Sequence, residues 1–94
     1  MLVLMAMLGV QAQAAYILLP MDAKGQRNHL KAYGITYWVL QNGVEAWWLL
    51  NYRGGSFAFA HSKALEKECI TRGVSYEVIP DAQFALIRNQ IADQ

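Results

Sequence analysis

Apolar and polar stretches alternate along the chain at lengths typical of strands and helices. Residues 16–19 form a continuous apolar run that ends at Pro20, which is typical of a strand covered on both faces. Apolar residues also dominate 45–52 and 74–79, so we predict a second and a third strand there. Residues 57–60, which follow a break rich in glycine, are predicted as a short extended piece before the next helix.

Three helices are predicted between and after these strands. Residues 28–41 carry apolar side chains at spacings of three and four residues, which places them on one face of a helix. Ser62 can cap a second helix, which is predicted to run to about Arg72 and to stop at Gly73. Asp81 is predicted to cap a last helix that continues toward the end of the chain.

The resulting order, βαβαβα, is the pattern of right-handed βαβ units that build a parallel sheet. We therefore predict an α/β fold with a small three-stranded, mainly parallel sheet, resembling the start of a flavodoxin-like or class I glutamine amidotransferase-like domain. Doubly wound domains commonly have about five strands or more, so residues 15–94 are expected to be the N-terminal part of a longer protein. Because one sheet edge would be unpaired, this piece is expected to unfold easily or to self-associate when expressed alone.

The N-terminus has the pattern of a secretory signal peptide. An uncharged apolar run is followed by Ala12 and Ala14, which form the A-x-A pattern that signal peptidase reads. The alternative is a buried core helix, and no Lys or Arg precedes the run. We predict that residues 1–14 are a signal peptide and that the mature chain begins near Ala15. The mature protein is then expected in the periplasm or cell envelope, with no transmembrane helix.

Composition and charge narrow the possible functions. The 8 basic and 7 acidic side chains give a net charge of +1, which offers no electrostatic argument for binding nucleic acid or an anionic membrane. Cys69 is the single cysteine, so it forms no internal disulfide. It is expected to be a small buried side chain, with a reactive thiol as the alternative. His29 and His61, with the scattered acids, do not have metal-ligand spacing, so neither a metal nor another cofactor is predicted.

The stretch after the second predicted strand carries most of the candidate chemistry. Gly54 and Gly55 lack side-chain bulk, so the backbone there can come close to a ligand. Arg53 can hold a carboxylate or phosphate in a two-pronged contact, and Ser56 can donate a hydrogen bond. His29, in the connection after the first strand, is expected at the same edge of the sheet. These five residues are predicted to bind a small anionic ligand. The alternative is a tight turn in which Arg53 is solvated or covers an aromatic ring.

The chain also carries a heavy aromatic load, with 3 tryptophans and 5 tyrosines. Such side chains are compatible with a sugar-stacking surface, but packing between helices and a sheet is their more ordinary role. Trp47 and Trp48 are adjacent, so they point to opposite faces of a strand. This alternation predicts that both faces of the sheet are covered.

Three segments, 28–34, 48–57 and 72–79, resemble the start of a family of exported bacterial proteins commonly labelled asparagine synthetase B. The resemblance covers nearly all of the mature chain, and members of that family are several times longer. Glutamine-hydrolysing asparagine synthetases use an N-terminal cysteine nucleophile, whereas signal cleavage here would expose Ala15.

We therefore expect an exported domain of that family that binds a small anionic ligand or a partner, with no catalytic site in this segment. The remainder of the same protein is one expected partner. The alternative is a fragment of an amidotransferase or asparagine synthetase whose catalytic residues lie beyond Gln94. Whether the chain belongs to an enzyme is left open at this point.

Overall fold

The computed structural model describes residues 15–92. Within this range the chain forms one sheet and three helices. The elements are β1 (Ala15–Leu19), α2 (His29–Gln41), β2 (Ala46–Leu49), β3 (Ser56–Ala60), α3 (Lys63–Arg72), β4 (Glu77–Pro80) and α4 (Asp81–Ala92). The predicted signal peptide, residues 1–14, lies outside the described residues.

All neighbouring strands in the sheet are antiparallel, and their order is β2-β3-β1-β4. Ile17 of β1 lies opposite Phe59 of β3 on one side and Val78 of β4 on the other, so β1 and β3 are the central strands. The elements from β1 to β4 follow the order βαββαβ. With this strand order, they form the ferredoxin-like, or split βαβ, arrangement.

The predicted three-stranded, mainly parallel sheet is therefore wrong, and so is its likeness to a flavodoxin-like or amidotransferase-like domain. Residues 57–60, predicted as a short extended piece, belong to β3, which pairs with both β1 and β2. β1 and β2 run in the same direction, but β3 lies between them, and β1 lies between β3 and β4 in the same way. Each of the two helices α2 and α3 thus connects two parallel strands that have an antiparallel strand between them. The order of elements along the chain does not reveal this inserted strand.

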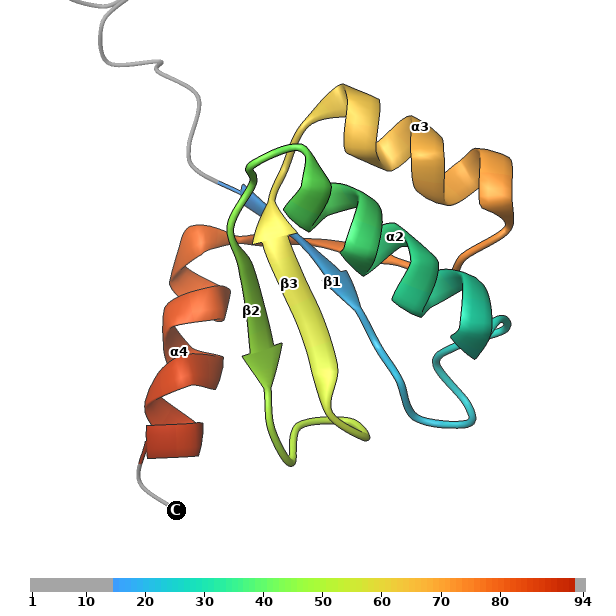
Figure 1. Ribbon diagram of the computed structural model, residues 1–94. Helices are drawn as coiled ribbons and strands as arrows, with labels where there is room; N and C mark the ends of the chain where they lie inside the picture. Colours follow the sequence, from blue (N-terminus) through green and yellow to red (C-terminus); the bar gives the residue numbers. More distant parts are fainter. Residues whose placement is uncertain (1–14, 93–94) are drawn as a thin grey trace, which may run out of the picture.

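The sheet is the middle of three layers (Figure 1). α2 and α3 lie on one face, where Ile35 of α2 packs in the same cluster as Ile17 and Phe59 of the sheet. α4 lies on the opposite face, where Phe84 packs against a cluster that contains Leu18. β1 is therefore covered on both faces, as its continuous apolar run predicts.

Capping residues fix the ends of α2 and α3 where the sequence predicts them. The side chain of Asn28 accepts the backbone N–H of Lys31 at 3.3 Å, and Ser62 accepts that of Leu65 at 3.1 Å. Gly73 ends α3 in the left-handed conformation, with φ of 70°. The predicted positions of these two helices are confirmed. No helix in the described range is both long and apolar enough to cross a membrane.

Candidate functional site

The turn between β2 and β3 has an unusual backbone conformation. Asn51 and Arg53 have φ of 66° and 46°, a region that residues other than glycine seldom occupy, and Gly54 has φ of 82°. Gly54 lies directly against the β1–α2 connection, because a Cβ built on it would be 2.9 Å from the carbonyl carbon of Met21 and the backbone nitrogen of Asp22. The missing side chain at position 54 lets two backbone segments touch each other.

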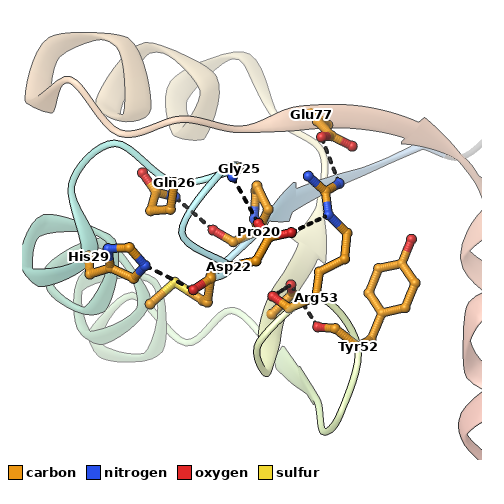
Figure 2. Close-up of polar contacts among 10 residues, drawn as sticks. Pro20, Asp22, Gly25, Gln26, His29, Tyr52, Arg53 and Glu77 are labelled. Atoms are coloured by element: carbon orange, nitrogen blue, oxygen red, sulfur yellow. Dashed lines mark hydrogen bonds and ion pairs between the residues drawn. The ribbon is translucent and has the colours of Figure 1, made fainter.

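Arg53 ties three segments together at this end of the sheet, as Figure 2 shows. Its Nε donates to Oδ2 of Asp22 at 3.3 Å, and its Nη1 donates to Oε2 of Glu77 at 2.8 Å. The hydrogen bond to Glu77, more than the one to Asp22, raises the pKa of the Arg53 guanidinium above its ordinary value. With two carboxylates around one guanidinium, these three side chains carry a net charge of −1.

The other oxygen of the Asp22 carboxylate is also engaged. Oδ1 accepts the backbone N–H of Gly25 at 2.9 Å, which closes the turn before α2 (Figure 2). Asp22 thus orders its own loop with one oxygen and holds Arg53 with the other. Arg53 meets carboxylates here, so the alternative in which it covers an aromatic ring does not describe its contacts.

The remaining predicted site residues lie close by. The backbone N–H of Met21 donates to the carbonyl of Arg53 at 3.2 Å, so the turn lies beside the β1–α2 connection at the expected end of the sheet. Nε2 of His29 is 2.8 Å from the carbonyl oxygen of Met21, so this nitrogen carries the proton and donates it. Ser56 is buried, and its hydroxyl lies 3.0 Å from the carbonyl of Tyr52 and 3.1 Å from that of Arg53. The role of these residues and of Gly55 in binding a ligand stays a prediction.

Two residues that organise this end of the sheet were not identified from the sequence. Glu77 is the second carboxylate on Arg53. Gln26 is buried, and its amide nitrogen donates to the carbonyls of Pro20 and Ser75 at 3.0 and 2.9 Å. Its amide oxygen accepts the backbone N–H of Ser75 at 2.9 Å and that of Asn28 at 3.2 Å. Because Gln26 lies in a polar loop and Glu77 in a short strand, only the tertiary fold distinguishes them from other polar residues.

A separate series of hydrogen bonds connects the residue after β3 with α3 and with the residue before β4. Nε2 of His61 is 2.9 Å from Oε1 of Glu66, and the Tyr76 hydroxyl donates to Oε2 of Glu66 at 2.8 Å. The hydrogen bond with His61, followed by that with Tyr76, lowers the pKa of Glu66 below its ordinary value. The hydrogen bond to Glu66 raises the pKa of Tyr76. A carboxyl group with a lowered pKa stabilises the fold above its ordinary pKa, and this contribution is lost as the pH falls through the lowered value.

Cys69 of α3 is fully buried in the core cluster that this helix shares with α2 and the sheet, which confirms the prediction that it is a small buried side chain. Burial raises the pKa of its thiol to about 11, so it stays protonated at neutral pH. Nε2 of His61 contacts Glu66, and no hydrogen bond joins His61 to Cys69 among the described residues. His61 instead lines an apolar cleft of about 410 Å³ between the end of α2 and the start of α3. Among residues 15–92, no three His, Cys, Asp or Glu side chains form a group that could hold a metal ion.

The other candidate surface is apolar and lies on the outer side of α2. Leu30, Tyr33, Tyr37 and Leu40 are all exposed, and their spacing of three or four residues places them along one flank of the helix. Trp48 of β2 is 63% exposed. We call these five residues the aromatic flank.

The flank extends from α2 to the edge of the sheet. The rings of Tyr33 and Phe57 meet edge to face, with centroids 5.8 Å apart, and Phe57 is the partner of Trp48 in the β2–β3 register. On the other side of the helix, Gly34 faces Arg72 of α3. The flank therefore points away from α3 and toward β2.

The expectation that aromatic side chains pack in the core holds for only one of the adjacent tryptophans. Trp47 packs beneath α4, with its ring 5.3 Å from Phe84 and 5.7 Å from Tyr16. Trp48, which points to the other face, lies at the surface. A strand pattern tells which face a side chain takes, but not whether a helix extends far enough to cover it.

Comparison of the chain with protein-family models, with curated proteins and with solved structures found no match.

Proposed function

We propose that this chain is an exported protein-binding domain, related to the family labelled asparagine synthetase B, that docks a partner protein through the aromatic flank. The observation that carries the proposal is the continuous exposure of Leu30, Tyr33, Tyr37 and Leu40 on α2 beside Trp48 on the outermost strand. Large apolar side chains gathered on one surface are typical of interaction sites.

The residue types on the flank fit a protein partner. Tyrosine and tryptophan are enriched at interfaces because they supply a large contact area and lose little conformational entropy when bound. The flank contains no charged side chain, as the buried centre of an interface requires. Exposed to between 55% and 83% of their full area, its five side chains offer apolar surface of several hundred Å². That is comparable to the ~800 Å² per partner of a standard interface.

The alternative of a small anion at Arg53 has weaker support. An anion there would have to displace or share the guanidinium that Asp22 and Glu77 already hold. It would also approach a cluster whose net charge is −1, so repulsion from the two carboxylates would oppose its binding. Arg53 is therefore better explained as a residue that ties together the ends of β1, β2 and β4.

Site-specific photo-cross-linking in the producing cell tests the proposal. A photoreactive amino acid at Tyr37 should give an adduct whose partner can be identified by mass spectrometry. The same group at Leu86, exposed on α4 to 63%, should give none. The adduct should come from the envelope fraction, with a first residue near Ala15.

Two results would reject parts of the proposal. Equal adducts from positions 37 and 86 would reject the flank as a specific docking surface. An adduct found in the cytoplasm that still begins at Met1 would reject export while leaving the docking role in place.

A further inference from the structure

The two outer strands of the sheet differ in how their free edges are protected. Within residues 15–92, β2 and β4 each pair with a single neighbour, so each leaves one row of backbone N–H and C=O groups without a strand partner. β4 begins at the charged Glu77 and ends at Pro80, which has no N–H to donate. β2 has the sequence Ala-Trp-Trp-Leu, with neither a charge nor a proline. β2 is therefore the edge to which another strand can add.

We infer that the partner at this edge is a second copy of the chain, whose β2 pairs antiparallel with this β2 about a two-fold axis. This inference rests on the proposed docking role of the aromatic flank. Every strand pair in the sheet is already antiparallel, so the added pair continues the same pattern across the axis. Main-chain hydrogen bonds between the two β2 strands would then join the two sheets into one.

The same two-fold axis brings the flanks of the two copies together. It places both α2 helices on the same face of the joined sheet and in opposite directions. The N-terminus of each helix then lies toward the C-terminus of the other, which is the favourable arrangement of the helix dipoles. Tyr37 and Trp48, half-exposed or more in one copy, become covered by their counterparts.

Charge and area both favour a second copy as the partner. A two-fold interface sets each residue near its own counterpart or its neighbours, so a charged surface would repel itself. The flank and β2 carry no charged side chain, so self-pairing sets no like charges against each other among these residues. A flank of several hundred Å² in each copy, together with the strand pairing, reaches the size of a standard interface, on the order of 1,600 Å² in total.

Sedimentation equilibrium of the purified chain from about 1 to about 100 μM tests the inference. We expect a monomer–dimer equilibrium that Trp48→Glu weakens by about a hundredfold or more, because the axis brings two carboxylates together at an apolar edge. Leu86→Glu places the same charge on a side chain of equal exposure, 63%, and should leave the dimer unchanged. An equimolar mixture of Trp48→Glu and Trp48→Lys should restore association.

Circular dichroism melting shows whether each variant is folded. If Trp48→Glu is unfolded, Tyr37→Glu replaces it, because Tyr37 lies on α2 and is 64% exposed. A monomer at every concentration would overturn the inference, as would a dimer that a folded Trp48→Glu variant forms equally well. A monomer in solution whose position 37 still cross-links to a different protein in the cell would reject the second copy and retain the proposed docking function. Absence of both association and adduct would reject both.

Discussion

The Arg53 end of the sheet and the aromatic flank differ in how much of their side-chain surface the rest of the chain covers. At the Arg53 end, one guanidinium meets the carboxylates of Asp22 and Glu77, and Asp22 also closes its own turn. On the flank, Tyr37 and Trp48 leave most of their surface open to solvent. The fold thus provides partners for the charged side chains but leaves most of the apolar surface exposed to solvent.

The residue types alone do not reveal this difference. An arginine beside two glycines has the appearance of a ligand loop, and a run of aromatic residues has the appearance of a core. In the folded chain, Gly54 makes room for a neighbouring backbone segment, and Tyr33 and Tyr37 of α2 remain exposed. What decides the role of each group is the element that packs against it.

The largest expected effect tests whether the Arg53 end is a closed contact. Gly54→Ala should lower the free energy of unfolding by about 3 kcal/mol or more, because it combines a left-handed backbone with a collision against Met21 and Asp22. Gly43 is the matched control, since its φ is 74° but a Cβ there meets nothing within 4 Å. Gly43→Ala should cost only about 1 kcal/mol. Urea unfolding compares the two, and equal losses would show that the turn can open.

The sequence predicts where the helices and strands lie better than it predicts which strands are adjacent in the sheet. Ser62 and Gly73 mark the ends of α3 through a local hydrogen bond and a left-handed backbone conformation, and these two predictions are confirmed. Strand adjacency depends on contacts between distant residues. The pairing of β3 with β1 joins positions about forty residues apart, such as Leu19 and Phe57, and no local signal marks it.

The dependence of strand adjacency on distant contacts also explains which residues of the Arg53 end the sequence predicts and which it misses. The Arg53 turn and the β1–α2 connection that leads to His29 were expected at one end of the sheet, and they lie there because β1 and β2 run in the same direction. Glu77 was missed because β4 enters this end only through its antiparallel pairing with β1. A charged partner supplied by an unexpected strand changes Arg53 from a free cation to one held in an ion pair.

The second prediction compares the adjacent tryptophans, which lie on opposite faces of β2. Trp47→Ala should lower the free energy of unfolding by about 2–3 kcal/mol, because it removes ring contacts with Tyr16 and Phe84 under α4. Trp48→Ala should cost less than about 1 kcal/mol, because most of the side chain is exposed. Both are measured at a concentration too low for association, since a dimer would add to the apparent stability. Equal losses would mean that Trp48 is part of the core, which would contradict an open flank.

The third and smallest effect concerns Arg53 itself. Arg53→Ala should lower the free energy of unfolding by about 1–2 kcal/mol, because it removes two ion pairs and leaves two carboxylates facing each other at a partly exposed site. Arg53→Lys should recover only part of this loss, since one ammonium group cannot reproduce the two directed contacts of the guanidinium. Arg72, paired with Glu68 within α3, is the control, and Arg72→Ala should cost about 0.3–0.5 kcal/mol.

Salt and anions separate the structural role of Arg53 from a ligand role. Added salt screens surface charges, so the stability difference between the native chain and Arg53→Ala should shrink as sodium chloride is raised. A ligand role predicts a different outcome: acetate or phosphate would raise the melting temperature of the native chain but not that of Arg53→Ala, because only the native chain would bind the anion. Such anion-specific stabilisation would show that Asp22 and Glu77 can release the guanidinium, and the Arg53 end would then be an open site like the flank.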